Sequence, residues 1–231
     1  MQTITFADLS PSPDLRFELD SAYRRVMASG RYILGPEVEA FEREFALSIG
    51  ASGCVGVGSG FDALAMAMLA LGVMPGDEVL LPANAPLPVP MAVSSIGARP
   101  RFVDPDWAYG NLDVNTIPVT GRARALIVVH LYGQPANMPL LREFATDLHL
   151  ALIEDCSQAH GARIGRWSVG AWGDASAWSF YPTKNMGGYG DGGAITVREN
   201  NGILEKARQM RFYGAGEMHG RNSRLDELQA A

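Results

Sequence analysis

The sequence predicts an α/β protein, with a mostly parallel sheet flanked by helices, built as one large domain. Its 231 residues are 47% hydrophobic and include 26 glycines, so the chain can bury a sizeable core. Strand-like runs alternate with helical patterns along the chain, as a parallel sheet with helical crossovers requires. No internal repeat, low-complexity tract or interdomain linker divides the sequence, which indicates a single domain.

The expected elements follow one another in a regular order. Apolar residues at helical spacing predict five helices, and short apolar runs between turn residues predict seven strands. The helices are expected at residues 14–28, 37–48, 62–71, 139–147 and 204–212. The strands are expected at residues 54–57, 78–81, 99–103, 125–130, 151–154, 175–180 and 193–197. Because Pro86, Pro88 and Pro90 each lack an amide donor and restrict the preceding residue, no regular helix is expected through this proline segment.

Charge and cysteine content exclude several classes of protein. A formal net charge of −6 predicts no binding of nucleic acid or of anionic membrane surfaces. Cys54 and Cys156 lie too far apart in sequence for a disulfide framework or a zinc motif, so no metal site is expected and the reducing cytoplasm is the expected location. Residues 1–10 lack a signal-peptide pattern, and the most apolar helical stretch, 63–74, is shorter than the roughly 20 residues of a membrane span.

One lysine stands out as a candidate nucleophile. Lys184 follows the apolar segment 175–180 and precedes the glycine-rich loop 187–193. Backbone and aromatic groups around such a loop partly desolvate the amine, which favours its neutral, nucleophilic form. A lysine in this setting can form a Schiff base with pyridoxal phosphate. The alternative is a loop cation with a solvated head.

A carboxylate upstream strengthens the first interpretation. The predicted strand at 151–154 leads into Asp155, at the strand end where open α/β sheets present ligand contacts. Pyridoxal chemistry needs a carboxylate beside the pyridine nitrogen, because a protonated ring is the better electron sink. Asp155 fits that role, and its alternative is a turn or helix-capping aspartate.

A Gly-x-Gly-x-x-Ala pattern at residues 58–63 is the basis of a competing hypothesis. It resembles the dinucleotide-binding fingerprint of nicotinamide oxidoreductases. Asp77 and Glu78 lie near the expected ribose-binding distance, but they precede a strand instead of ending it. The amides at Gly60, Phe61 and Asp62 would instead suit the single phosphate of pyridoxal phosphate.

Several motifs along the chain are specific enough to compare with known families. They are SGRYILGPEVEAFEREFA (29–46), GVGSGFDAL (56–64), PGDEVLLPAN (75–84), VHLYGQPANM (129–138), IEDCSQAHGA (153–162), SFYPTKN (179–185), GDGGA (190–194) and NSRLDELQAA (222–231). Taken together and in this order, they resemble the DegT/DnrJ/EryC1/StrS sugar aminotransferases. The resemblance covers nearly all of the chain, and the motifs at 29–42 and 82–84 are most similar to those of the branch that acts on dTDP-3-keto-6-deoxyhexoses.

The resemblance implies a fold, a cofactor and a reaction. The fold would be the large domain of a fold type I, aspartate aminotransferase-like enzyme dependent on pyridoxal 5′-phosphate. The reaction would transfer an amino group from glutamate to a nucleotide-linked keto sugar, in deoxyamino sugar or polysaccharide biosynthesis. Lys184 would carry the cofactor and move the proton, while Asp155 would keep the pyridine nitrogen protonated.

The resemblance also implies further cofactor contacts. Gly60 and Phe61 would bind the phosphate with their amides, Ser179 would donate its hydroxyl to the same phosphate, and Gln158 would contact the ring hydroxyl. The alternatives are a strand-end serine that satisfies the backbone and a solvated turn glutamine. Histidine and tyrosine side chains near the site are expected to be structural; they are His130, Tyr132 and His160.

Asn222 would reach the phosphate bound by a neighbouring subunit, which makes the working unit at least a homodimer. Its alternative role is capping of the last helix beside Ser223, whose spacing to Asp226 resembles a capping box.

Two departures from the family pattern are the basis of an alternative in which the chain keeps the fold but is catalytically impaired. Pro86 stands where relatives have an aromatic that stacks on the cofactor ring, and loss of such a stack costs about 1 kcal/mol, or roughly five- to tenfold in affinity. The sequence ends at Ala231 inside a predicted helix, so residues 1–231 are expected to be a large domain without the smaller C-terminal domain. A catalytically impaired paralogue that keeps the fold is the alternative to an active aminotransferase.

Overall fold

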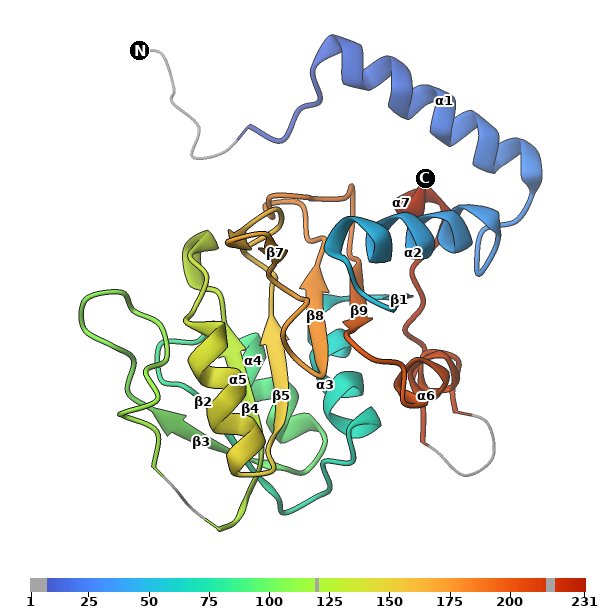
Figure 1. Cartoon of the computed structure of the whole chain (residues 1–231). Coiled ribbons are helices and arrows are strands. Elements are labelled where there is room, and N and C mark those ends of the chain that lie inside the picture. Colours follow the sequence, from blue (N-terminus) through green and yellow to red (C-terminus); the bar gives the residue numbers. More distant parts are fainter. Residues whose placement is uncertain (1–7, 119–120, 215–218) are drawn as a thin grey trace.

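A computed structural model describes residues 8–118, 121–214 and 219–231, and shows a seven-stranded sheet in the order β1-β9-β8-β5-β4-β2-β3 (Figure 1). A separate two-stranded hairpin, β6 with β7, was not predicted. The strands are β1 (Gly53–Val57), β2 (Glu78–Pro82), β3 (Arg99–Val103), β4 (Ala123–Val129), β5 (Ala151–Asp155), β6 (Arg163–Ile164), β7 (Trp167–Ser168), β8 (Ala175–Ser179) and β9 (Gly193–Val197).

All seven predicted strands and all five predicted helices are present, with boundaries that differ by a few residues. Helix α4, the four-residue α7 and a 3-10 turn at Leu131–Gly133 are additional. The helices are α1 (Pro13–Ser29), α2 (Pro36–Ile49), α3 (Gly60–Ala70), α4 (Pro88–Ser95), α5 (Met138–Asp147), α6 (Ile203–Met210) and α7 (Glu227–Ala230).

Helix α4 corrects the expectation for the proline segment. The helix begins at Pro88, and Pro90 is its third residue. The first four amides of a helix have no intrahelical acceptor, so prolines in the first turn remove no hydrogen bond. The three prolines therefore mark a helix start, whereas they were expected to forbid a helix.

The sheet is mostly parallel, as predicted, with one exception. Strand β9 pairs antiparallel with both of its neighbours, β1 and β8, while the other four strand pairs are parallel. The carboxyl ends of β1, β8, β5, β4, β2 and β3 therefore lie along one edge of the sheet. Ligand contacts in open α/β sheets gather at such an edge.

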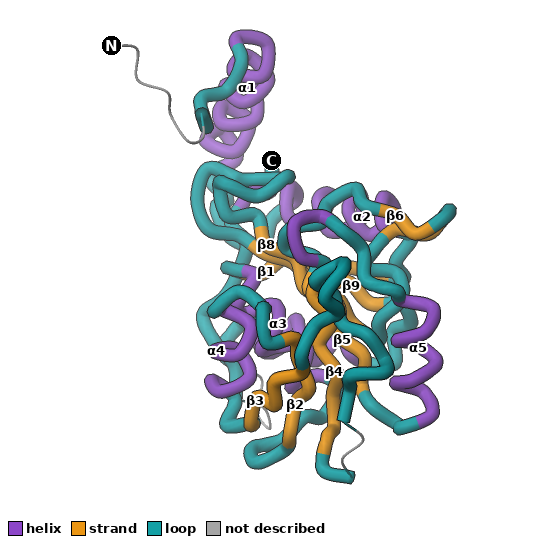
Figure 2. The backbone as a smooth tube through the Cα atoms, turned by 90° about the vertical axis from the view of Figure 1, so that its left-hand side faces the viewer, coloured by secondary structure: helices purple, strands orange, loops and turns teal. Residues whose placement is uncertain are grey.

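Helices cover both faces of the sheet. Figure 2 shows α3 and α4 on one side of the strands and α5 on the other. Buried residues of α6 share the core of α3 and α4, and α2 packs against β1, β8 and β9 in a smaller aromatic core. Because side chains alternate along a strand, Ile153 and Ala177 face the α3 side, and the same alternation points Asp155 and Ser179 to that side.

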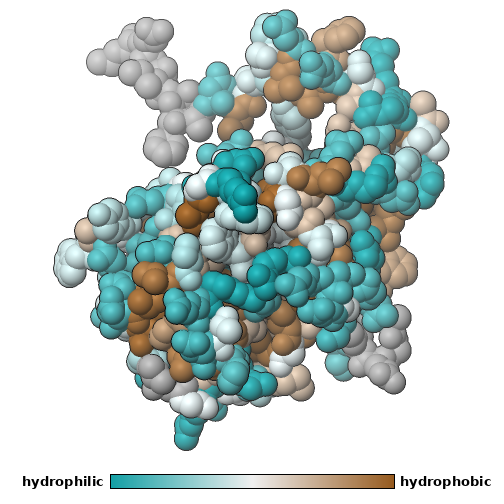
Figure 3. Space-filling view, viewed as in Figure 1, coloured by the Kyte–Doolittle hydropathy of each residue, from teal (hydrophilic) through white to brown (hydrophobic). Residues whose placement is uncertain are grey.

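Helix α1 adds little to these cores. Val26 is its one buried residue, and Phe17 and Tyr23 are exposed. In Figure 3, hydrophobic and hydrophilic side chains are mixed on the surface around this helix. Among the described residues, no helix has the length and apolar character needed to cross a bilayer.

Candidate active site

A cavity of about 290 Å³ opens at the carboxyl ends of β5 and β8, beside the N-terminus of α3. It brings together six of the seven predicted site residues, and Asn222 is the one that does not line it. The lining residues are Ser59, Gly60, Phe61, Leu64, Pro86, Pro88, Val89, Val129, Asp155, Ser157, Gln158, Ser179, Tyr181, Lys184, Asp191 and Gly192.

The N-terminus of α3 forms one wall of the cavity and can bind an anion. Ser59 caps the helix, because its hydroxyl accepts the amide of Asp62 at 3.1 Å. The amide of Asp62, which was expected to bind the phosphate with those of Gly60 and Phe61, is therefore already occupied. Within the described residues, the amides of Gly60 and Phe61 have no protein acceptor. A Cβ atom on Gly60 would lie 2.6 Å from the Cβ of Ser179, so glycine is needed for this close approach. Two free amides and a serine hydroxyl therefore converge on one point.

A second segment of the chain braces this helix start. Ser223 accepts the amide of Gly58 at 3.0 Å and donates its hydroxyl to Asp62 at 2.7 Å. Arg221 pairs with the same carboxylate at 3.0 Å. The negative charge of Asp62 is therefore compensated, and an anion at the free amides does not face a bare carboxylate.

The capping role considered for Asn222 together with Ser223 is wrong. The N-cap of α7 is Asp226, whose carboxylate accepts the amide of Gln229 at 2.8 Å. The hydroxyl of Ser223 points instead to the α3 region, where it has two partners. A Ser-x-x-Asp spacing does not distinguish these arrangements, because both use a short polar side chain beside a helix start.

Lys184 lies in the loop that follows β8 and is partly buried. Its amide donates to the carbonyl of Tyr181 at 2.8 Å, which closes a tight turn at the mouth of the cavity. The loop is closed again where Gly188 donates to the carbonyl of Phe180 at 2.7 Å. The turn and the closed loop hold the lysine beside the cavity.

Asp155 ends β5 at the floor of the cavity and is 4% exposed. Its carboxylate accepts the amide of Ser157 at 3.0 Å, and within the described residues it forms no ion pair. Burial raises the pKa of Asp155 above its ordinary value, although the hydrogen bond from Ser157 and the charge of Lys184 act in the opposite direction. The site therefore holds a buried acid that a cationic ligand would stabilise in its charged form.

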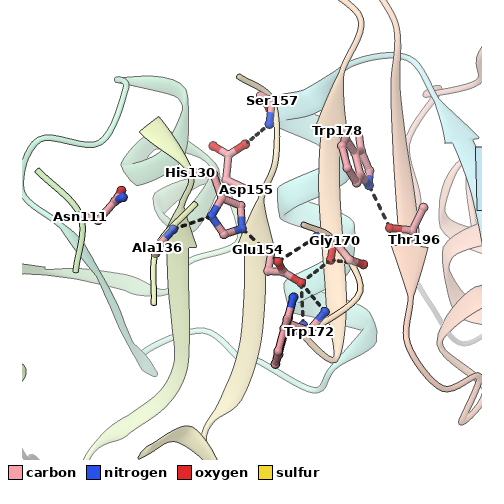
Figure 4. A network of polar contacts seen from close by, with 12 residues as sticks. Asn111, His130, Ala136, Glu154, Asp155, Ser157, Gly170, Trp172, Trp178 and Thr196 are labelled. Atoms are coloured by element: carbon pink, nitrogen blue, oxygen red, sulfur yellow. Dashed lines mark hydrogen bonds and ion pairs between the residues drawn. The ribbon is translucent and has the colours of Figure 1, made fainter. Parts of the chain in front are cut away.

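The preceding residue, Glu154, points away from the cavity into a saturated network (Figure 4). The amides of Gly170, Trp172 and Gly173 donate to it at 2.6–2.9 Å, and the hydroxyl of Ser176 donates at 3.2 Å. His130 completes the set from Nε2, at 2.9 Å.

This network fixes the protonation of its members. Because Nδ1 of His130 accepts the amide of Ala136 at 3.1 Å, the ring proton is on Nε2 and is donated to Glu154. Burial alone would raise the pKa of Glu154, but the hydrogen bonds from His130 and the loop amides outweigh it and lower the pKa. Donor atoms of His130, Glu154 and Cys156 lie within 4.8 Å of one another, but both imidazole nitrogens already have partners.

Gln158 lines the cavity with one end of its amide already engaged. Its Oε1 accepts the amide of Tyr132 at 2.8 Å, and no acceptor among the described residues takes the Nε2 hydrogens. Tyr132 itself is exposed and has a positive φ of 56°, and it contacts Gln158 through its backbone amide. His160 packs between Trp178 and Phe180, and burial together with the charge of Lys184 lowers its pKa to about 4. His160 is therefore neutral at neutral pH, in agreement with a structural role.

Asn222 is exposed and lies outside the cavity of its own chain. It forms a β-bridge with Phe212, and its side-chain oxygen accepts a hydrogen bond from Arg224. Its neighbour Ser223 reaches the loop at Gly58, so Asn222 is close to the start of α3 without entering the site.

Other cavity residues were not predicted as site residues. Ser59 carries the signal of a helix cap, a serine directly before a helical run. Ser157 and Asp191 belong to motifs of the family resemblance, but neither had a role assigned to it. Besides Pro86, the lining residues without a predicted role are Ser59, Leu64, Pro88, Val89, Val129, Ser157, Tyr181, Asp191 and Gly192.

The geometry gives no support to the nicotinamide hypothesis. Asp77 accepts the amide of Met74 at 2.8 Å, in the turn that precedes β2. Parallel β2 presents its carboxyl end to the cavity edge, so Asp77 and Glu78 lie at the opposite edge of the sheet. Neither carboxylate can reach a ribose bound beside α3.

Comparisons with known proteins agree with this geometry. The sequence profile of the DegT/DnrJ/EryC1/StrS aminotransferase family matches residues 13–231. The chain belongs to this family. A relative from Streptomyces venezuelae, dTDP-3-amino-3,4,6-trideoxy-alpha-D-glucose transaminase, is 45% identical over 99% of this chain and 62% of its own length.

Solved structures that resemble this chain confirm the fold. S. venezuelae DesV in complex with a ketimine intermediate has a TM-score of 0.90 at 47% identity, over 94% of this chain and 60% of DesV. NtdA from Bacillus subtilis with bound cofactor PMP has a TM-score of 0.89 at 29% identity, over 99% and 55% of the two chains. The expected fold type I architecture is therefore confirmed, and the chain spans about three fifths of the length of the relatives that it matches.

Proposed function

We propose that this chain is the cofactor-binding part of a pyridoxal phosphate-dependent aminotransferase that moves an amino group from glutamate to a nucleotide-linked keto sugar of the dTDP-keto-6-deoxyhexose type. The observation that carries the proposal is the 290 Å³ cavity, where Lys184, the buried Asp155 and the free amides of α3 meet. The substrate class comes from the S. venezuelae relative, whose name specifies a dTDP-amino sugar.

The residues present fit the cofactor at three points. The amides of Gly60 and Phe61, with the hydroxyl of Ser179, form a cradle for a phosphate at a helix N-terminus. Gln158 has Nε2 hydrogens to donate to a ring oxygen.

Asp155 would act on the ring nitrogen. Its carboxylate is buried without an ion pair among the described residues, and a protonated pyridine nitrogen would supply the missing cation. Pyridoxal phosphate, when bound, supplies an electron sink for the carbanion formed at the α-carbon of the amino donor. Asp155 keeps that sink effective by keeping the nitrogen protonated.

Lys184 would have two tasks in turn. Its amine first holds the cofactor in the cavity. Once released by the amino donor, the amine would carry the proton from the donor α-carbon to the C4′ carbon of the cofactor. In the second half of the reaction, the same amine would carry a proton from C4′ to the former carbonyl carbon of the sugar.

The full site would need a second subunit. Asn222 lies beside the α3 loop but outside its own cavity, which supports a role at the phosphate of a neighbouring chain in a two-fold homodimer. Cys54 and Cys156 are free and buried, which supports a cytoplasmic enzyme.

Covalent labelling tests the proposal directly, because the sequence contains two lysines, Lys184 and Lys206. The chain is incubated with pyridoxal phosphate and reduced with borohydride, and the modified peptide is identified by mass spectrometry. The modification should fall on Lys184, and it should persist in the matched control Lys206→Arg and disappear in Lys184→Arg. Addition of glutamate before reduction should decrease the absorbance of the lysine-bound form. Equal modification of both lysines, or none, would show that the cavity is not a pyridoxal phosphate site.

A further inference from the structure

The short helix α7 is fixed firmly to the start of α2. Glu227 is 1% exposed, and its carboxylate accepts the amides of Gly35 at 2.8 Å, Glu37 at 3.0 Å and Val38 at 3.0 Å. Gly35 precedes α2 and has no side chain with which to cap it. Glu227 therefore supplies the cap from 192 positions away in sequence, and the position of α7 is set by α2.

Two residues further on, Gln229 contacts the loop that carries Lys184. Its Oε1 accepts the amide of Tyr189 at 2.9 Å. A Cβ atom on Gly188 would lie 2.7 Å from Oε1, and one on Gly190 would lie 3.1 Å from Nε2. The loop wraps closely around this side-chain amide, and glycine on both sides of Tyr189 makes that approach possible.

The hydrogen bond between Tyr189 and Gln229 holds the loop beside the turn that contains Lys184. The loop is closed by Phe180, whose amide donates to Gly192 at 2.9 Å and whose carbonyl accepts from Gly188 at 2.7 Å. Within the part of the chain that the structure describes, Gln229 provides the only side-chain hydrogen bond to residues 182–191. Besides these backbone bonds, the loop that carries Lys184 is therefore tied to the rest of the described chain by one glutamine side chain.

We propose that Gln229 is a positioning residue for Lys184: by binding the Tyr189 amide from a helix fixed to α2, it holds the loop so that the lysine amine faces the cavity. This inference rests on the proposed function of Lys184 and extends it to a residue outside the cavity. A hydrogen bond to a loop amide limits how often the loop opens, and an opened loop moves the amine away from its reacting partner.

The test uses the full chain and three variants. Gln229→Leu keeps the size of the side chain and removes the acceptor, while Gln229→Glu keeps an acceptor. Gln209→Leu is the matched control, because Gln209 is exposed on α6 and its side chain has no hydrogen bond among the described residues. Two quantities are measured: amide hydrogen exchange of the peptide covering 184–190 without cofactor, and the rate of pyridoxal phosphate attachment to Lys184 by borohydride trapping, with Lys206 as an internal reference.

Gln229→Leu should accelerate loop exchange about tenfold and slow attachment at Lys184 about tenfold, the factor that corresponds to one lost hydrogen bond. Gln229→Glu and Gln209→Leu should stay within about twofold of the unmodified chain. If Gln229→Leu lowers the melting temperature but leaves both quantities unchanged, Gln229 is a stabilising residue and the proposal is wrong. If the unmodified chain does not attach the cofactor at Lys184, the proposed function fails separately. Loop exchange then decides whether Gln229 holds the loop, and unchanged exchange in Gln229→Leu overturns the proposal.

Discussion

Two neighbouring carboxylates at the end of β5 have opposite surroundings. Glu154 is fully buried and accepts hydrogen bonds from His130, Ser176 and three loop amides. Asp155, on the other face of the sheet, has Ser157 as its hydrogen-bond partner and lines the cavity. The pKa of Glu154 is lowered and that of Asp155 is raised. Among the described residues, the carboxylate of Glu154 is surrounded by donors that tie it to the fold, whereas the carboxylate of Asp155 has one partner residue and, in the proposed function, binds the ligand.

Among substitutions of these two carboxylates, Asp155→Asn is expected to have the largest effect, which is on turnover. An amide cannot keep the ring nitrogen protonated, so turnover should fall by about 10²- to 10³-fold, as when one preorganised charge contact is removed from an active site. The free energy of unfolding should change by less than about 1 kcal/mol, because the lost carboxylate has a single amide partner. Single-turnover kinetics and urea unfolding measure the two quantities, and near-normal turnover would remove Asp155 from the mechanism.

Glu154→Gln should show the reverse pattern. The substitution places an NH₂ group among donors and breaks a buried charged network, which costs about 3 kcal/mol of unfolding free energy. Cofactor attachment to Lys184 in the remaining folded protein should stay within about fivefold of the unmodified chain. If Glu154→Gln kept its stability but no longer attached the cofactor at Lys184, Glu154 would serve the cofactor and the assignment of Asp155 to that role would be wrong.

Pro86→Tyr tests the cavity around Asp155. Its expected effect is smaller and is a gain in cofactor affinity. Pro86 lines the cavity at the position where the family resemblance implies a stacking aromatic. Restoring a ring should tighten pyridoxal phosphate binding by roughly five- to tenfold, or about 1 kcal/mol. Leu87→Tyr is the control, since Leu87 is 69% exposed and does not line the cavity. Equal affinities of the two variants would show that position 86 does not face the ring.

The pH dependence of stability should differ in sign between the two carboxylates. The pKa of Asp155 is raised in the folded protein. Its ionisation therefore lowers the free energy of unfolding as pH rises above the ordinary pKa of 3.8, and this loss is complete above the folded pKa. Glu154 has a lowered pKa, so its stabilising contribution is present above its ordinary pKa of 4.5 and is lost as pH falls through the folded pKa.

Urea unfolding of cofactor-free protein between about pH 3 and 7 should therefore show two opposite trends, at about 1.4 kcal/mol per unit of pKa shift. Asp155→Asn should gain stability relative to the unmodified chain as pH rises, and Glu154→Gln should lose it. Parallel curves for the two variants would contradict the assignment.

The sequence was sufficient to predict the sheet, the Lys184 loop and Asp155, because strand periodicity and the motif spacings are local features. It could not distinguish the environments of Glu154 and Asp155, because alternation places them on opposite faces without saying which face a helix N-terminus covers. The partners of Glu154 come from the irregular loop at Gly170 to Gly173, which has no periodic signal. The same holds for Gln229, whose contact with Tyr189 spans 40 positions. Helix α4 was missed because its prolines lie at positions where a helix tolerates them.

A crystal structure of the chain soaked with pyridoxal phosphate tests the central claim most directly. The ring nitrogen should lie about 2.7–3.0 Å from the carboxylate of Asp155, with C4′ bonded to Nζ of Lys184 and the phosphate at the amides of Gly60 and Phe61. A ring bound to Lys184 but directed away from Asp155, or a phosphate bound at another site, would contradict the account.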